Sequence, residues 1–405
     1  MNLLFVADGR SPTARSWITN VQKDGHQVSL ISTYPCQGLP GLMEFDVLPV
    51  ALSSFAATRR AEAGMVANPA EHSRRLIKTF RPHLLGLRYI LGPLTLPLYR
   101  KRFLEIVERL GPQLIHALRI PFEGMLAQSA PLKYPLVVSI WGNDLTLHAN
   151  GSYRMGKYTQ YTLQRADGLM ADANRDLRLA RSWGYRSDRP SLVVPGSGGI
   201  DLEQIEKART SSPRHLIEMI PVNHKLIVNP RGLRPGSLRS DVFFKAARIV
   251  ANRRPDVCFA CPTMAGQPEA ERMLKDHELS ENVLLLPSLT QSDLWWLFAH
   301  AEVVISPGEH DGVPNSLLEA MASGCFPIAG DIESLREWIT PGINGLLYPP
   351  ADAVALAESI LLILENPDRV FETARKNRTL IRERADVAAI RRKVSDFYKL
   401  TASQQ

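Results

Sequence analysis

The sequence predicts an α/β protein with two doubly wound domains, each a parallel sheet covered by helices. The chain has 405 residues, which exceeds one ordinary hydrophobic core and favours two domains of roughly 200 residues. Short apolar runs alternate with helical patterns along the whole chain, as expected for parallel sheets. Hydrophobic residues make up 45% and charged residues 22% of the sequence, which is typical of a globular protein.

The apolar runs form one series in each half of the chain. In the first half we expect strands at residues 3–7, 27–32, 114–116, 136–140, 169–171 and 192–194. In the second half we expect them at residues 225–228, 257–260, 283–286, 303–305, 326–329 and 346–348. Helical patterns lie between them, for example at residues 13–23, 240–252, 268–275 and 292–299. Two such series predict two doubly wound sheets.

The domain boundary is expected after the glycine-rich turn at residues 195–201. Residues 1–201 would form the N-terminal domain and residues 224–386 the C-terminal domain. Residues 202–223 are polar and poor in strand pattern, so they are expected to form a linker. A last helix within residues 387–405 has no strand after it.

Composition excludes several classes of protein. Four cysteines do not make a disulfide framework in a chain of this length, and Cys258 and Cys261 lie in an apolar run that predicts a buried strand rather than a metal site. No run reaches the ~18 apolar residues of a membrane-spanning helix. Residues 84–99 come nearest, but arginine and proline interrupt them. The chain opens on a strand-like run without a basic leader, so we expect a cytoplasmic protein.

The net charge of +7 is concentrated in residues 59–102, where only two acids, Glu62 and Glu71, are present. The basic residues of this segment are Arg59, Arg60, Arg74, Arg75, Lys78, Arg81, Arg88, Arg100, Lys101 and Arg102. The segment is either a solvated helical face or a surface for anionic lipid head groups or an anionic acceptor. No nucleic-acid recognition motif accompanies the charge, so nucleic acid is not expected as a partner.

The most informative stretch follows the apolar run at residues 303–305. Gly312 and Pro314 mark a turn, and Asn315 or Ser316 is expected to cap the helix that follows. The unpaired amides and positive dipole end of such a helix suit an anionic or hydroxyl-rich ligand.

Two acids flank this helix start. Asp311 precedes it, and Glu319 lies one turn into the helix, on the side opposite to Leu317, Leu318 and Met321, which are expected to face the core. The pattern alone is also compatible with an ordinary capped helix.

The stretch from Ser306 to Gly324 resembles the signature of glycosyltransferase family 4, in which two acids separated by seven residues precede an Ala-Met-Ala-x-Gly tail. Asp311 stands in place of the first glutamate. Residues 324–328, 333–337, 342–348 and 352–366 follow the order of that family. The resemblance implies the GT-B fold, in which two Rossmann-like domains face each other across a cleft and the last helix crosses back onto the N-terminal domain.

The resemblance also implies a reaction. A retaining glycosyltransferase moves a sugar from a nucleotide diphosphate, UDP- or GDP-linked, to an acceptor and forms an α-linkage, with neither a metal nor a fixed protein nucleophile. The acceptor would be a saccharide, a lipid-linked glycan or a small molecule, as in glycan or cell-envelope polysaccharide biosynthesis. The protein would then work in the cytoplasm or peripherally at the inner face of the membrane.

On the donor side, the resemblance implies that Glu319 binds the ribose hydroxyls and that Asp311 and the backbone of residues 312–315 hold the transferred sugar. The backbone near residues 286–289 would face the base. The expected donor-binding set is Gly9, Arg231, Arg239, Leu286, Ser288, Asp311, Gly312, Val313, Pro314, Asn315, Ser316 and Glu319.

Arg231 matches the family's arginine that grips the leaving diphosphate. The family's partner lysine falls on Leu238, so Arg239, or alternatively Arg234, is expected to replace it, because guanidinium also pairs well with phosphate. The two arginines would neutralise charge that develops on the diphosphate.

His116 matches the first histidine of a family His-x-His segment, and Leu118 stands in place of the second. His116 is therefore either a residue near the sugar or a structural histidine. The expected catalytic set is Asp311, Glu319, Arg231, Arg239 and His116. The expected acceptor side comprises Arg10, Ser11, Arg119, Asn143 and Asp144.

Other motifs give weaker evidence about function. The first turn has one glycine, Gly9, where a dinucleotide fingerprint needs three, although Gly9 could still allow a ligand to approach the backbone. The acids Glu309 and Asp311 have metal-site spacing, but the surrounding turn and helix favour a metal-free site. Asp201 is expected to cap a helix rather than to act in catalysis.

Two other functions remain open at this point. One is a catalytically silent member of the family that stabilises or regulates a partner enzyme, motivated by Asp311, Leu118 and Leu238 at altered positions. The other is a GT-B sugar-nucleotide epimerase, which needs carboxylates for acid and elimination chemistry that this signature does not supply.

Overall fold

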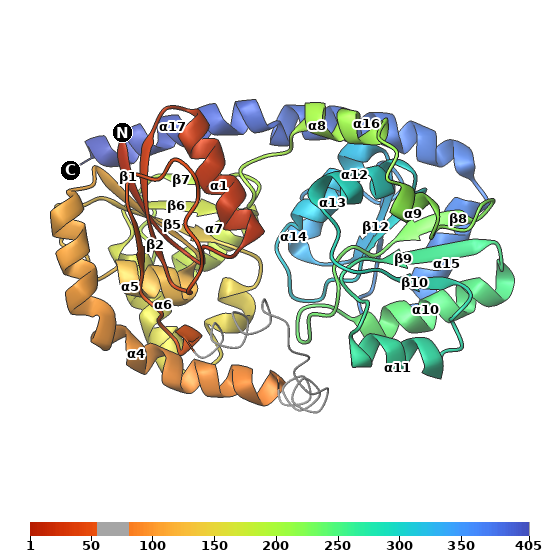
Figure 1. Ribbon diagram of the computed structural model, residues 1–405, viewed down its shortest axis with the longest axis horizontal. Coiled ribbons are helices and arrows are strands. Elements are labelled where there is room, and N and C mark those ends of the chain that lie inside the picture. Colours follow the sequence, from red (N-terminus) through yellow and green to blue (C-terminus); the bar gives the residue numbers. More distant parts are fainter. Residues whose placement is uncertain (55–80, 405) are drawn as a thin grey trace. The chain divides into compact units, whose positions relative to one another are not determined.

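The computed structural model describes residues 1–54 and 81–404 (Figure 1). It divides into two compact units. Unit 1 comprises Met1–Gly198 together with Ala388–Gln405, and unit 2 comprises Gly199–Val387. Each unit is a parallel α/β structure, as the sequence predicts.

The segment expected to be a linker, residues 202–223, is part of unit 2 and is largely structured. It contains α8 (Leu202–Arg209) and α9 (Arg214–Ile217). Asp201 caps α8, since its carboxylate accepts a hydrogen bond from the Gln204 amide at 3.0 Å, which confirms the capping role predicted for it. The linker prediction is wrong because polar helices with only a few buried positions look like loop in sequence.

Unit 1 holds a seven-stranded parallel sheet in the order β3-β2-β1-β4-β5-β6-β7. The strands are β1 (Asn2–Ala7), β2 (Gln27–Ser32), β3 (Phe45–Val47), β4 (Leu114–Leu118), β5 (Leu136–Ile140), β6 (Gly168–Ala171) and β7 (Ser191–Val193). All were predicted except β3, a half-buried edge strand of three residues.

Alternation along β1 sends side chains to both faces of this sheet. Leu3 and Phe5 join one core with α1 (Pro12–Lys23) and α17 (Val387–Ser403). Leu4 joins the opposite core, which α4 covers. The sheet is therefore buried on both faces, as expected for parallel strands.

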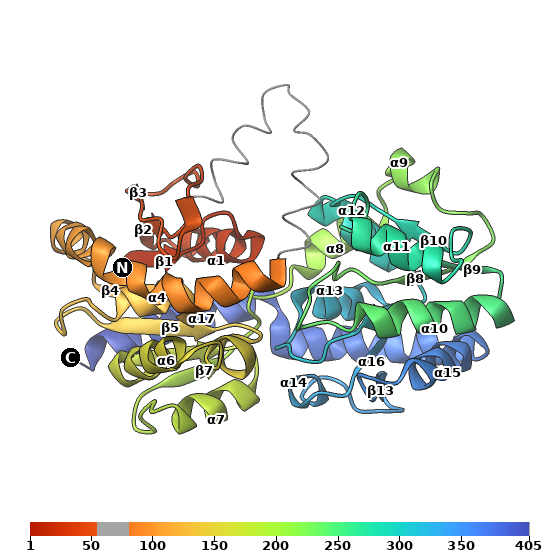
Figure 2. The same cartoon turned by 90° about the horizontal axis from the view of Figure 1, so that it is seen from below.

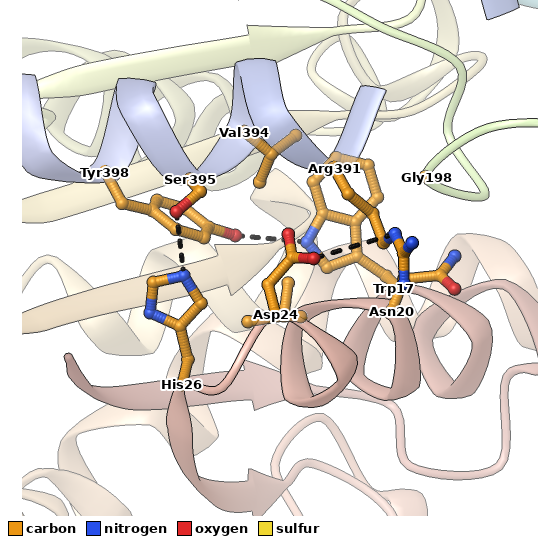
Figure 3. A pocket seen from close by; sticks show the side chains of 10 residues that line it. Trp17, Asn20, Asp24, His26, Gly198, Arg391, Val394, Ser395 and Tyr398 are labelled. Carbon is orange, nitrogen blue, oxygen red and sulfur yellow. Dashed lines mark hydrogen bonds and ion pairs between the residues drawn. The ribbon is translucent and has the colours of Figure 1, made fainter. Parts of the chain in front are cut away.

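The last helix, α17, is bonded to α1 and to the loop after it (Figure 3). The indole N–H of Trp17 donates to the Tyr398 hydroxyl at 3.1 Å, and His26 Nε2 lies 3.1 Å from Ser395 Oγ. The cavity beside these contacts has about 10 Å³, room for about one water, so it is not a ligand pocket.

The long helix α4 (Arg81–Leu110) runs through two prolines, Pro93 and Pro97, which interrupt the apolar run of this segment. A proline removes the amide that would bond to the carbonyl four residues earlier. Here Ser152 Oγ donates to the Tyr89 carbonyl at 2.8 Å and so replaces the bond lost at Pro93. The helix therefore continues.

Further helical segments of unit 1 connect the strands and cover the sheet. They are η2 (Ile120–Gly124), α5 (Met125–Ala127), η3 (Asp144–His148), α6 (Tyr153–Arg165) and α7 (Asn174–Ser182). Helix α4 packs against α5 and α6.

Unit 2 holds a six-stranded parallel sheet in the order β10-β9-β8-β11-β12-β13. Its strands, all predicted, are β8 (Lys225–Val228), β9 (Val257–Cys261), β10 (Val283–Leu285), β11 (Val303–Ser306), β12 (Phe326–Gly330) and β13 (Leu346–Tyr348). Cys258 and Cys261 are buried in β9, as expected.

Helices cover both faces of this sheet (Figure 2). They are α10 (Ser240–Arg253), α11 (Pro268–Asp276), α12 (Gln291–Ala299), α13 (Asn315–Ser323), α14 (Glu333–Arg336), α15 (Ala353–Leu364) and α16 (Pro367–Ala385). Helix α10 packs beside α15, and α13 packs beside α12 and α16. Among the described residues no helix is long and apolar enough to span a membrane.

Candidate functional site

The strand order of unit 2 places a topological switch point between β8 and β11. The chain leaves β8 toward one edge of the sheet and leaves β11 toward the other. In open α/β sheets, ligands bind beyond the carboxyl ends of the strands at such a point. The loops after β8 and β11 meet here, and they contain the arginines and acids that the sequence singles out.

Backbone contacts hold these two loops together. Leu238 pairs with Gly308 in an isolated bridge, and the Glu309 amide donates to the Ser237 carbonyl at 2.9 Å. Gly308 also lies against Gly330 of β12, where a Cβ would collide with the Gly308 carbonyl. The loop after β11 is therefore fixed by its neighbours on both sides.

Arg231 and Asp311 form an ion pair at the centre of the switch point. Both side chains are mostly buried, with 10% and 13% of their surface exposed. Asp311 also accepts the Gly312 amide at 3.0 Å, and Ser334 Oγ donates to the Asp311 carbonyl at 3.0 Å. The sequence assigns Arg231 and Asp311 to different parts of the donor, and the structure brings them into direct contact.

Buried polar atoms without partners surround this pair. They are Asn229 Nδ2, Arg231 Nε and Ser306 Oγ. Asn229 and Ser306 are each 1% exposed and lie at the ends of the adjacent strands β8 and β11. Buried polar groups are nearly always hydrogen-bonded, so unbonded atoms grouped at one place indicate a ligand site.

Glu319 lies on α13, the helix that leaves this loop. It is partly buried, and desolvation raises the pKa of its carboxyl to about 7, opposed by hydrogen bonding with Gln291 and Trp295 of α12. Leu317, Leu318 and Met321 are buried, as predicted.

The predicted cap of α13 is wrong. Pro314 occupies the cap position, no side chain caps the helix, and Asn315 is the first helical residue. Proline has no amide and Gly312 has already given its own to Asp311, so the predicted backbone cradle for a sugar offers fewer amides than expected.

The remaining arginines of the β8 loop differ in their contacts. Arg239 is held by Asp241, with bonds of 2.9 and 2.8 Å, and lies 3.5 Å from Glu309. These acids raise the pKa of Arg239. Arg234 is exposed, and Leu238, at the position of the family's lysine, is buried. Arg239 could serve a diphosphate only by exchanging its present partners.

The other predicted donor residues are spread along this edge. Val313 is buried with Pro314, and Ser316 is partly buried in the first turn of α13. Leu286 is buried, and its amide donates to the Cys261 carbonyl at 3.0 Å, whereas Ser288 is exposed in the loop after β10. The described residues contain no group of three metal-ligating side chains.

Unit 1 has its own switch point, between β1 and β4. Gly9 lies in the loop after β1, but a Cβ there would collide with Cys36 and crowd Ser32, whose hydroxyl accepts the Gly9 amide at 3.1 Å. Gly9 is thus required by the protein's own packing, and the predicted approach of a ligand is not supported. Ser11 is the cap of α1.

Asp144, predicted to bind acceptor hydroxyls, is completely buried and engaged within the protein. It accepts Arg119 Nε and Nη2 at 2.9 and 2.6 Å, and the Ile120 and Trp141 amides at 3.2 Å. Its role is to fix Arg119, which corrects the prediction. Asn143 is half-buried beside it.

His116 is a structural residue, which corrects its assignment to the catalytic set. This residue of β4 is completely buried, and its ring packs against Trp17 of α1 and Tyr398 of α17. Its Nδ1 lies 2.8 Å from the Tyr398 hydroxyl and its Nε2 lies 2.9 Å from Ser139 Oγ. Burial lowers its pKa to about 3, so the ring is neutral and out of reach of a substrate.

Two residues that the site prediction did not include lie near this switch point. Glu123 is 3% exposed and accepts the Thr33 hydroxyl at 2.6 Å, while its Oε2 is buried without a partner. Burial raises its pKa to about 7, opposed by the Thr33 hydroxyl and the charge of Arg119. Arg88 lies over the rings of Tyr34 and Phe122. No spacing rule marks either residue.

Only part of the basic segment lies within the described residues. Arg59, Arg60, Arg74, Arg75 and Lys78 lie outside them, and Arg81 is described by its backbone alone. Arg100, Lys101 and Arg102 are exposed on α4.

Comparison with known proteins places this geometry in a family. Residues 239–384 match the family model for glycosyl transferases group 1. Unit 2 carries a group 1 glycosyl transferase domain. The match confirms the resemblance seen in the sequence and includes the loop after β11 and helix α13.

Curated glycosyltransferases match part of this chain at low identity. The D-inositol 3-phosphate glycosyltransferase of Pseudarthrobacter chlorophenolicus is 26% identical over 194 residues, which are 47% of this chain and 45% of that protein. The amylovoran biosynthesis glycosyltransferase AmsK of Erwinia amylovora is 29% identical over 130 residues, 30% of this chain and 31% of that one. The matches thus span less than half the length of these relatives.

Solved structures show the fold over the whole chain. Sucrose-phosphate synthase from Thermosynechococcus elongatus superposes with a TM-score of 0.73 at 16% identity and covers 100% of both chains. Anabaena HepE, solved with UDP-glucose, superposes with a TM-score of 0.68 at 16% identity, covering 98% of this chain and 99% of that one. The predicted GT-B fold, with two doubly wound α/β units, is confirmed.

Proposed function

We propose that this protein is a retaining glycosyltransferase that moves a sugar from a nucleotide-diphosphate sugar to an acceptor and forms an α-linkage. The observation that carries the proposal is the Arg231–Asp311 pair with the unbonded polar atoms around it, at the switch point of a group 1 glycosyl transferase domain. UDP is the favoured nucleotide of the donor, because structural neighbours were solved with UDP or UDP-glucose.

In this proposal the diphosphate binds Arg231 and displaces part of its bond to Asp311. The guanidinium then stabilises the negative charge that grows on the diphosphate as the sugar leaves. Asp311, released from that bond, accepts a hydroxyl of the transferred sugar. Arg239 gives a second positive charge, so the proposal needs no metal cofactor.

Glu319 binds the ribose hydroxyls in this scheme. A carboxylate accepts two hydroxyl hydrogen bonds better than a protonated acid does, because the acid must use one oxygen as a donor. The raised pKa of Glu319 means that a part of this carboxyl is protonated near neutral pH before the nucleotide binds, and that it must lose this proton to bind the ribose best. Nucleotide affinity should therefore strengthen as pH rises through about 7.

The acceptor is a saccharide, a lipid-linked glycan or a small molecule, and its site would lie in unit 1. Two of the curated relatives are named for an inositol phosphate acceptor and for amylovoran biosynthesis. These names favour a hydroxylated acceptor and a role in glycan or cell-envelope polysaccharide biosynthesis.

We also propose peripheral attachment to the anionic inner face of the cell membrane through α4. Leu87, Ile90, Leu94 and Leu98 are exposed on this helix, spaced three or four residues apart, so they form one apolar ridge. Exposed Arg100, Lys101 and Arg102 follow directly. An apolar ridge beside basic side chains suits an anionic lipid surface, where each charge adds about 1 kcal/mol.

Calorimetric titration with UDP and GDP tests the function. UDP should bind the wild type, and Arg231→Ala should weaken binding about 10- to 100-fold, because a hydrogen bond to a charged group contributes about 1.5–3 kcal/mol. Glu319→Ala should also weaken it. Arg375→Ala, an exposed arginine of the same unit, serves as the control.

Transfer itself is checked by the anomeric configuration of the product in NMR. Absence of nucleotide binding by the wild type would contradict the proposal. Nucleotide binding without any transfer or hydrolysis would instead favour the silent family member, and sugar isomerisation would favour the epimerase.

A further inference from the structure

We propose that Arg10, Arg88 and Arg119 form an anion site in unit 1 that holds a phosphate group of the acceptor. The inference rests on the proposed function, because only a transferase has an acceptor. It narrows the acceptor to a phosphorylated molecule.

The three arginines come from separate elements and meet at one place. Arg10 follows β1 and Arg119 follows β4, the two strands at the switch point. Tyr34 connects Arg10 with Arg88, since the guanidinium carbon of Arg10 lies 3.6 Å and that of Arg88 lies 5.4 Å from the centre of its ring. Arg119 lies within electrostatic range of both Tyr34 and Glu123.

Arg88 carries the argument, because no acid of the described residues forms an ion pair with it. Two aromatic rings hold it in place, Tyr34 and Phe122, with the guanidinium carbon 4.9 Å from the centre of the latter. Within residues 1–54 and 81–404 it makes no ion pair, and its buried Nε has no hydrogen-bond partner. A half-buried guanidinium without a carboxylate is costly unless a ligand completes it.

Arg10 and Arg119 are oriented by acids that leave part of each guanidinium open. Asp8 bonds Arg10 through both Nε and Nη2 at 3.0 Å, and 27% of the Arg10 side chain stays exposed. Asp144 holds Arg119 in the same manner, with 33% exposed. Arg119 has a φ of 133°, a strained backbone of the kind found at functional sites.

The acids present do not balance the cluster. Asp8 neutralises Arg10, and Asp144 neutralises Arg119. Glu123 is then the nearby acid that could balance the charge of Arg88. Glu123 is bonded to Thr33 through one oxygen, and its buried environment favours the neutral acid. With Glu123 neutral, one positive charge is left over, and the free Oε2 side of the acid can take part in a hydrogen bond to an anion.

The geometry favours phosphate over carboxylate. A phosphate monoester presents three terminal oxygens and two negative charges, and guanidinium forks pair with it through two parallel bonds. Three guanidinium groups offer more N–H donors than the roughly four acceptor positions of a carboxylate can use, so a phosphate matches them better.

The test is calorimetric titration of the full chain with inorganic phosphate, against sodium chloride of equal ionic strength. It is run in the wild type, in Arg88→Ala and Arg88→Lys, and in Arg154→Ala, an exposed arginine of α6 in the same unit, as a control. Because phosphate could also bind Arg231 in unit 2, the series is repeated in an Arg231→Ala background. A second series compares glucose 6-phosphate with glucose.

We expect phosphate binding in the wild type and in Arg231→Ala, at least a tenfold loss in Arg88→Ala, partial recovery in Arg88→Lys and no change in Arg154→Ala. Glucose 6-phosphate should bind and glucose should not. Phosphate binding that is absent from the wild type, or independent of Arg88, overturns the inference.

UDP titration separates this inference from the proposed function. If UDP binds normally to Arg88→Ala while phosphate binding is lost, both are supported. If the wild type binds phosphate through Arg88 but binds neither UDP nor GDP, the proposed function fails and the anion site stands without its assignment to an acceptor.

Discussion

At the scale of single residues, burial separates structural groups from groups available to a ligand. His116 and Asp144 both match expected site positions, yet each has its hydrogen-bonding atoms satisfied inside unit 1. Asn229, Ser306 and Glu123 instead keep unbonded polar atoms at the carboxyl ends of the sheets. The unsatisfied atoms, more than the motif positions, mark where a ligand is expected.

The structural role of His116 predicts an effect on stability without one on binding. His116→Ala should lower the free energy of unfolding by about 2–3 kcal/mol, because it leaves the buried Tyr398 and Ser139 hydroxyls without a partner and opens a cavity. Urea denaturation measures this. His215→Ala, an exposed histidine, should change it by less than about 1 kcal/mol. A loss of UDP affinity in folded His116→Ala would contradict the structural role.

The raised pKa of Glu123 predicts that the stability of the folded protein depends on pH. Its pKa is about 7 in the folded chain and near its ordinary 4.5 when unfolded. Between these pH values the folded state binds a proton that the unfolded state does not, so this group lowers stability as pH rises through that range, by about 3 kcal/mol in total.

Glu123→Gln should remove this contribution. The stability of the variant relative to the wild type, measured by urea denaturation from pH 4 to 8, should therefore increase up to about pH 7 and then level off. Parallel profiles for the two proteins would show that Glu123 is already ionised in the folded state.

At the scale of elements, the strands were predictable and the irregular parts were not. All the expected strands are present, because runs of buried apolar residues are a strong local signal. Strand β3 was missed because Phe45–Val47 is short and only half-buried. The length of helix α4 was not predictable, because a contact distant in sequence, from Ser152, compensates for Pro93.

The residues of the two candidate sites also divide into those that the sequence predicted and those that it did not. The Arg231 loop and the acids of α13 were found through local motif spacing, and the structure places them at one switch point. Glu123 and Arg88 were not found as site residues, because their significance comes from burial and from aromatic neighbours on other elements. Sequence spacing carries no information of that kind.

The ridge on α4 predicts attachment to anionic vesicles. Replacing both Leu94 and Leu98 with serine should reduce co-sedimentation with vesicles that contain phosphatidylglycerol by at least tenfold, since each buried leucine contributes about 1.5–3 kcal/mol. Binding should also weaken with salt. Phe371→Ser removes an exposed apolar side chain from α16 and should leave binding unchanged. Equal loss in both variants would contradict a specific ridge.

At the scale of the whole molecule, each unit has its own hydrophobic core. Separate cores predict that heating gives two calorimetric transitions. UDP should raise only the transition of unit 2, and Tyr398→Ala should lower only that of unit 1, because Tyr398 is buried in its core. A single transition that responds to both changes would show that the units unfold together.

Helix α17 has a consequence for biosynthesis. Ile390, Val394 and Phe397 complete a core that includes residues of β1 and α1, more than 350 residues earlier in the chain. The ribosome makes these residues only after the whole of unit 2, so one face of the N-terminal sheet stays apolar and uncovered until they emerge, whereas the glycosyl transferase domain already has its whole sequence. The part that is made first is therefore the part that finishes folding last, and it is the natural client of chaperones on the nascent chain.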